Sequence, residues 1–351
     1  MSEQAAGCAL FDHASNYPRG HLIDGRGRVT PLLALVLVFS AAVVSCARIT
    51  TIEWESPVAQ GHPLVGRIWD VKAGAFIDAR ALGGRLAASR FVLLGERHDN
   101  PDHHVLQAQT LRALIAAGRR PAVGFEMFST DDAPAIARHL AGSPKDASGL
   151  GDAVNWKRSG WPDWRFYQPI AQAALDAGLP IAATNLSRAA IDALRKNGLA
   201  GLGPTLVRQL KLDGGPTPAT RAAMAKEIRE SHCGQAPEAM LDRMVDIQWA
   251  RDARMAEALA RAGGRDGTVL ITGTGHVRRD RGVPAHLARH APGTSMASVA
   301  LLEVHAQATA PVEYAARFDG VLPFDYVWFT PRIDDVDPCE KFKQQLERLK
   351  K

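Results

Sequence analysis

The chain has 351 residues, of which 46% are hydrophobic and 23% are charged, values that are ordinary for a globular protein. Its net charge of +5 is dispersed, and no basic stripe is interleaved with aromatic residues. This composition argues against a nucleic-acid-binding protein and leaves a globular fold of one or two domains.

An apolar segment at residues 31–44 is too short for a comfortable membrane span but suits a signal-peptide core. Two arginines precede it, and the sequence Val43-Val44-Ser45-Cys46 that ends it resembles a bacterial lipobox. We therefore expect residues 1–45 to be a lipoprotein signal peptide and Cys46 to carry lipid. The protein would then be anchored in the cell envelope, with the outer membrane facing the periplasm as its expected location. The alternative is a plain secretory signal with an incidental cysteine.

Export to an oxidising compartment would allow the remaining cysteines to form a disulfide. Once the signal segment and the lipidated cysteine are set aside, Cys233 and Cys339 remain, an even pair in an oxidising compartment. We expect them to form a disulfide. Two free thiols or a metal-binding pair are the alternatives.

The mature chain begins with a lead-in at residues 46–75, in which Ile68 and Trp69 fit a short edge strand. Elements then alternate over residues 76–351. Short apolar runs predict strands at 91–95, 122–125, 179–185, 268–273, 298–304 and 326–329. Helical spacing of apolar residues predicts helices at 105–115, 133–140 and 169–177. The segment 151–170 is rich in large rings, and we expect it to be an insertion.

This alternation favours one α/β domain, with a mostly parallel central sheet and helices on both faces. A largely helical insertion is expected at about 186–262, where alanine, leucine, methionine and paired charges dominate.

Acidic and imidazole side chains follow three of the predicted strands. Glu96 and His98 come after the strand at 91–95, while Glu126 and His276 follow two others. In open α/β sheets the carboxyl ends of the strands form the edge where ligands bind. Capping of the next helix by Asp99 or Asn100 leaves Glu96 and His98 unexplained. We therefore expect these four side chains to share a site.

Two kinds of chemistry suit this mixture of ligands. A divalent cation such as zinc, manganese or cobalt prefers imidazole together with carboxylate. The same groups without a metal can perform general acid–base catalysis.

Several segments together resemble the ChaN-like haem-binding uptake family. They lie, in order, at residues 93–101, 125–128, 178–186, 273–284 and 337–340. Members are bacterial iron-regulated lipoproteins proposed to bind haem, and the wider superfamily includes the Tiki metalloproteases and erythromycin esterases. The resemblance places Glu96, His98, Glu126 and His276 at the polar site of that superfamily.

The resemblance also implies candidate haem contacts. The family is thought to hold haem through a tyrosinate, which suits ferric iron, and Tyr167 lies in the ring-rich segment. His98, His276 and His232 are the other candidates.

The sequence thus predicts a membrane-anchored lipoprotein that binds haem for iron acquisition, with a homodimer sandwiching flat ligands as the expected assembly. The alternative is a metal-dependent hydrolase, an esterase or peptidase, that uses Glu96, His98, Glu126 and His276 to activate water. A scaffold protein whose polar residues merely satisfy strand ends is the third reading.

Overall fold

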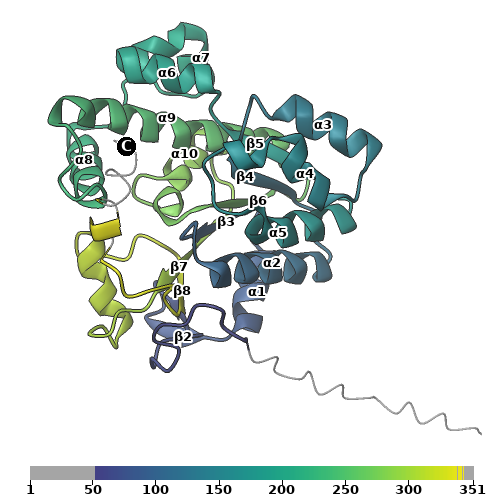
Figure 1. Cartoon of the computed structure of the whole chain (residues 1–351), viewed down its shortest axis with the longest axis vertical. Coiled ribbons are helices and arrows are strands. Elements are labelled where there is room, and N and C mark those ends of the chain that lie inside the picture. The colour runs from purple at the N-terminus through teal and green to yellow at the C-terminus, as the bar shows by residue number, and fades with distance from the viewer. Residues whose placement is uncertain (1–51, 338, 342, 344–351) are drawn as a thin grey trace, which may run out of the picture. The chain divides into compact units, whose positions relative to one another are not determined.

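An eight-stranded sheet forms the centre of the computed structural model (Figure 1), which describes residues 52–337, 339–341 and 343. The signal peptide predicted for residues 1–45 and the predicted lipidation of Cys46 lie outside the described residues. The strands are β1 (Ile68–Asp70), β2 (Ala75–Ile77), β3 (Phe91–Glu96), β4 (Ala122–Ser129), β5 (Ile181–Asn185), β6 (Thr268–Gly273), β7 (Met296–Glu303) and β8 (Tyr326–Thr330).

The strand order is β2-β1-β8-β7-β3-β6-β4-β5, and every pair from β8 to β5 is parallel. This confirms the predicted mostly parallel sheet. Strand β1 pairs antiparallel with both β2 and β8, so it is not an edge strand as predicted. The edge is β2, whose three residues are too few to show an alternating pattern.

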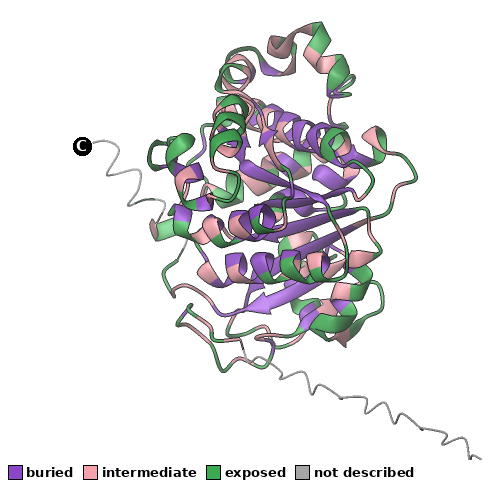
Figure 2. Cartoon of the chain, turned by 90° about the vertical axis from the view of Figure 1, so that its right-hand side faces the viewer, coloured by how far each residue is buried: buried purple, intermediate pink, exposed green. Residues whose placement is uncertain are grey.

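Helices cover both faces of the sheet (Figure 1). Those that pack with one face are α1 (Ala79–Ala87), α2 (Pro101–Ala116), α4 (Ala147–Ala153) and α5 (Trp164–Asp176), with α3 (Ala133–Gly142) beside them; α9 (Glu238–Ala262) and α10 (Val283–His290) pack with the other. Successive strand residues point to opposite faces, so Val92 and Leu94 join the first cluster and Phe91 and Leu93 the second. Buried residues accordingly follow the strands and the inner sides of the helices (Figure 2).

The ring-rich segment contributes to the core. Helix α5 begins at Trp164 and is capped by Asp163, and the side chains of Trp164 and Tyr167 are buried together with Trp156. Trp161 and Phe166 of this segment are half-buried at the surface. The predicted insertion is thus mostly the packed start of a helix, because its large apolar rings gain more from burial than from exposure.

A third, smaller core lies among α6 (Arg188–Asn197), α7 (Gly203–Gln209), α8 (Pro218–Ser231) and part of α9. The end of α8 is tied to the C-terminal segment, since Cys233 and Cys339 form a disulfide with their Cα atoms 5.5 Å apart. Within the described part of the chain, no helix is long and apolar enough to cross a membrane.

Candidate functional site

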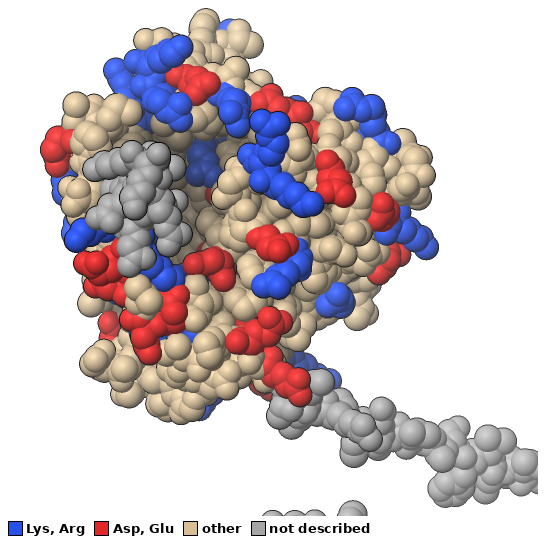
Figure 3. Space-filling model, viewed as in Figure 1, with Lys and Arg blue, Asp and Glu red and all other residues tan. Residues whose placement is uncertain are grey.

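Three neighbouring parallel strands bring the predicted side chains together. Strand β6 lies between β3 and β4, so the carboxyl ends of all three meet at one edge of the sheet. Glu96 ends β3, Glu126 lies in β4, and His276 belongs to the short 3-10 helix η3 (Thr274–Val277) that follows β6. With His98 they line a cavity of about 590 Å³. Figure 3 shows the hollow on this face, bordered by α8 and α9.

Glu96 and His98 form an open pair at the wall of this cavity. The imidazole Nδ1 donates to Glu96 Oε1 over 2.7 Å. Burial alone would lower the pKa of His98, but the adjacent Glu96 carboxylate outweighs it and raises that pKa to about 9. The His98 side chain remains 36% exposed, whereas Glu96 Oε2 is fully buried and has no hydrogen-bond partner in the described structure. The imidazole is therefore partly open to the cavity, and Glu96 retains an unused hydrogen-bond acceptor buried behind it.

Aromatic rings pack around this pair. Tyr167 is fully buried, and its hydroxyl donates to Glu96 Oε1 over 3.4 Å. Burial, reinforced by the negative charges of Glu96 and Glu126, raises the pKa of Tyr167 and keeps its phenol neutral. Trp161 approaches His98 edge-on, with ring centroids 4.8 Å apart. Tyr167 therefore orients Glu96 from behind, while Trp161 forms part of the cavity wall.

His276 belongs to a closed network. Its Nδ1 donates to Asp252 Oδ1 over 2.6 Å, and its Nε2 lies 3.2 Å from Glu126 Oε1. Burial would lower the pKa of His276, but the two carboxylates raise it to about 9. Both ring nitrogens are thus occupied by protein carboxylates.

Glu126 has partners on both oxygens. Thr272 Oγ1 and the backbone N–H of Gly273 donate to Oε2 over 2.6 and 2.8 Å, and Arg251 donates to Oε1. Burial opposes ionisation of Glu126, yet the charges of His276 and Arg251 hold its pKa well below the usual range. The carboxylate is therefore ionised and saturated with hydrogen bonds.

Two members of this network were not identified from the sequence. Arg251 and Asp252 lie on α9, within a pattern that predicts only a helix. A sequence signal that could have identified them is a charged pair flanked by apolar Ala250 and Ala253 inside a helix. A charge buried among apolar residues needs a partner. Burial raises the pKa of Asp252, and the charge of His276 opposes that rise.

The predicted metal site does not form as a cluster. In the described part of the chain, no group of three or more histidine, cysteine or acidic side chains has the arrangement of a metal site. One reason is that both nitrogens of His276 are bonded to carboxylates, so this imidazole has no nitrogen left for a metal. The four side chains line one cavity but divide into two separate pairs.

His232 lies apart from both pairs. It follows the end of α8, where its Nδ1 donates to the carbonyl of Ile228 over 2.8 Å. It lines a smaller adjacent cavity of about 200 Å³ that also contacts Asp252.

Comparisons with known proteins bear on the fold and the family of the chain. Among solved structures, the chain is similar to one reported as cofacial heme binding to ChaN of Campylobacter jejuni, with 22% identity, a TM-score of 0.59 and coverage of 74% of this chain and 95% of that one. At that identity the likeness shows the fold. A type III effector, HopBA1, matches with 14% identity and a TM-score of 0.41 over 80% of this chain and 100% of its own. The erythromycin esterase EreC matches with 12% identity and a TM-score of 0.40 over 73% and 95%.

No curated protein sequence matches the chain significantly. A family model described as "Haem-binding uptake, Tiki superfamily, ChaN" matches residues 82–287, which span β3, β4, β6 and the histidine that follows β6. The chain therefore belongs to the ChaN-like haem-binding uptake family of the Tiki superfamily.

Proposed function

We propose that the protein binds haem in the cavity that contains Glu96 and His98, as a membrane-anchored lipoprotein that serves iron acquisition. The family supports haem as the ligand. The observation that carries the site is the open pair: a partly exposed imidazole and a buried carboxylate oxygen without a partner in the described structure, at the wall of a cavity of about 590 Å³. A cavity of this volume suits a ligand of haem's order of size.

Among the candidate haem contacts, His98 is the one that we propose as the iron ligand. Tyr167 is fully buried and its raised pKa opposes formation of a tyrosinate. Both nitrogens of His276 are bonded to carboxylates, and His232 lines a different cavity. His98 donates from Nδ1 to Glu96, which leaves Nε2 for another partner; because its raised pKa keeps a proton on Nε2 at neutral pH, the iron would displace that proton.

The neighbouring residues fit this role. A metal-bound imidazole usually donates its other N–H to a carboxylate, which fixes the ring and raises its basicity, and Glu96 is placed to accept that hydrogen bond. Tyr167 in turn fixes Glu96. Bound haem would supply an iron atom that accepts the nitrogen ligand, and the protein would orient the imidazole.

The test is a titration of residues 47–351 with hemin, followed by the Soret band. We expect a shift in the wild type that His98→Ala weakens at least about tenfold, because a direct ligand is lost. His232→Ala is the matched histidine control and should bind hemin normally. Tyr167→Phe should also retain the shift. Absence of a shift in the wild type would overturn haem binding, and loss of the shift in Tyr167→Phe alone would assign the iron to the tyrosine.

Anchoring and assembly are separate parts of the proposal. A Cys46→Ala variant expressed in a bacterial host should move from the membrane fraction to the soluble envelope fraction. Sedimentation of residues 47–351 with and without hemin tests whether a homodimer forms around the ligand. An unchanged membrane fraction for Cys46→Ala would contradict lipid anchoring.

A second candidate function rests on the buried network. Asp252, His276 and Glu126 form a carboxylate–imidazole–carboxylate series beside the cavity, an arrangement able to hold and transfer a proton. In a hydrolase, Glu96 would be the free carboxylate that activates water. Turnover of an ester or peptide panel that is abolished by Glu96→Ala would support this function.

A further inference from the structure

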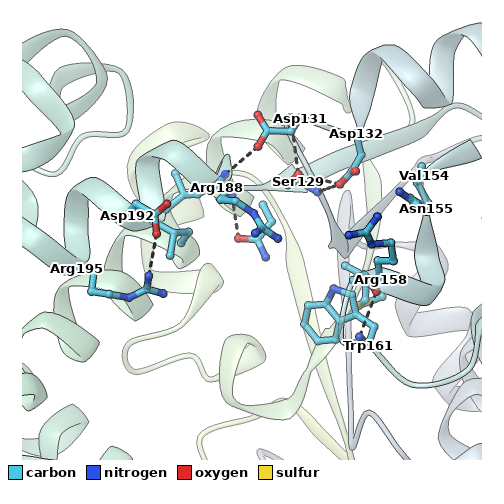
Figure 4. A pocket seen from close by; sticks show the side chains of 15 residues that line it. Ser129, Asp131, Asp132, Val154, Asn155, Arg158, Trp161, Arg188, Asp192 and Arg195 are labelled. Atoms are coloured by element: carbon cyan, nitrogen blue, oxygen red, sulfur yellow. Dashed lines mark hydrogen bonds and ion pairs between the residues drawn. The ribbon is translucent and has the colours of Figure 1, made fainter. Parts of the chain in front are cut away.

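A second, larger cavity lies beside the proposed haem site. Its volume is about 740 Å³, and it lies at the carboxyl ends of β4 and β5, between α4 and α6 (Figure 4). Trp161 lines both cavities. Their floors are also joined, because Arg251 of the first donates to Asn185 of the second over 3.2 Å. The two cavities are therefore neighbouring parts of one edge of the sheet, and both are lined by the indole of Trp161.

The acidic side chains of this second cavity already have partners. Asp132 accepts from the backbone and hydroxyl of Ser129, both over 2.8 Å. Asp131 accepts from the backbone N–H of Arg188 over 2.8 Å, and Asp192 pairs with Arg195 at the same distance. Their charges are thus partly satisfied within the protein.

Two basic side chains of the cavity differ from these. Within the described residues, neither the Arg158 nor the Arg188 guanidinium has a carboxylate within ion-pair distance. Arg158 ends the 3-10 helix η1 (Trp156–Arg158) and Arg188 begins α6, so they approach from opposite walls, with Trp161 next to Arg158 (Figure 4). Lys and Arg side chains also gather on this part of the surface, beside the hollow (Figure 3). Two guanidinium groups of the cavity therefore form no ion pair in the described structure, while its three carboxylates accept hydrogen bonds from other groups.

We propose that Arg158 and Arg188 bind the carboxylate groups of the ligand whose flat ring lies against Trp161. This inference rests on the proposed haem function, and it assigns the propionate groups of haem to the second cavity. A guanidinium matches a carboxylate with two parallel N–H donors, which gives orientation as well as affinity. The half-buried indole at the border offers a flat apolar surface to a porphyrin ring. The residues of the second cavity would then select dianionic porphyrins over neutral ones.

The experiment compares hemin with its dimethyl ester, which has the same ring but no free carboxylates. Wild-type protein should bind hemin about tenfold more tightly than the ester, and the double variant Arg158→Ala/Arg188→Ala should bind both equally, at the level of the ester. Both arginines are exposed, so the variant should fold normally, which circular dichroism checks. Arg138→Ala, an exposed arginine on α3 outside the cavity, removes one positive charge and should leave the preference for hemin intact.

The outcomes separate this inference from the proposed function. If the wild type binds neither porphyrin, the haem function itself fails. If it binds both equally, or if the double variant keeps the preference for hemin, haem binding stands and the role of the arginines is overturned. Inorganic phosphate tests a free-anion source: if it binds the wild type but not the double variant while the two porphyrins bind alike, the arginines form a separate anion site and the proposal is also overturned.

Discussion

The two imidazole–carboxylate pairs of the site have the same chemistry but different surroundings. Glu96 and His98 leave one carboxylate oxygen without a partner in the described structure and an imidazole that is 36% exposed. Glu126 and His276 are almost wholly buried, and a second carboxylate, Asp252, completes the shell of His276. The pKa of each histidine is raised to about 9, so titration alone does not distinguish the pairs.

The difference shows which pair can serve a ligand and which holds the strand ends together. The buried Glu126 carboxylate is fully hydrogen-bonded and connects β4, β6 and α9. A ligand could bind this carboxylate only by displacing one of its hydrogen bonds. The open pair has unused bonding capacity. We therefore expect substitutions in the closed pair, Glu126 and His276, to change stability. Substitutions in the open pair, Glu96 and His98, should change ligand binding.

Substitution in the closed pair should reduce stability most. Glu126→Gln removes the negative charge that pairs with His276 and Arg251, so half-buried Arg251 loses its carboxylate partner and buried His276 keeps only Asp252. We expect the free energy of unfolding to fall by about 3 kcal/mol. Urea denaturation at pH 7 provides the measurement.

Glu96→Gln is the matched substitution in the open pair. Its amide oxygen can still accept from His98, whose side chain reaches solvent, so the loss should be about 1 kcal/mol or less. Equal losses in the two variants would contradict the distinction between the pairs.

The pH dependence of stability gives an intermediate effect. His276 has a pKa of about 9 in the folded protein, above its unfolded value of about 6.5, so the folded state binds the proton more tightly. The contribution of protonated His276 to the free energy of unfolding is therefore complete below pH 6.5 and is lost as pH rises through about 9. The stability difference between wild type and His276→Gln should shrink by about 2 kcal/mol over that interval.

His98→Gln serves as the comparison. The pKa of His98 is raised to a similar value, so its stability difference from wild type should also shrink over this interval. A stability difference for His276→Gln that stays constant between pH 6.5 and 9 would contradict the raised pKa of His276.

The smallest effect tests the packing that positions His98. A methyl group at Gly273 would lie 3.1 Å from both Cε1 and Nε2 of His98, and the backbone of Gly273, with φ −67°, accommodates alanine. Gly273→Ala should push the imidazole away from Glu96 and lower the pKa of His98, with a stability loss of about 1 kcal/mol. Proton NMR titration of the ring measures the pKa. Gly275→Ala, where the nearest atom is Glu227 Oε1 at 4.0 Å, should leave it unchanged.

Much of the fold could be predicted from local patterns. The apolar runs at β3 and β6 are located within a residue, because buried parallel strands are uniformly apolar and end at glycine or charge. Asn100 caps α2 with Pro101 in its first turn, as its sequence predicts. Strand β2 and the early start of α5 could not be predicted, since their residues lack a periodic signal that separates them from loops.

For the candidate site, too, local patterns predict one part and leave the other undetermined. Local patterns predict that Glu96, His98, Glu126 and His276 follow strands, and parallel strands carry such residues to one edge. Which of these side chains pair depends on the packing, because β6 lies between β3 and β4 and α9 brings Asp252 and Arg251 to the closed network. Burial and pairing depend on distant segments packing together, and no local pattern records that contact.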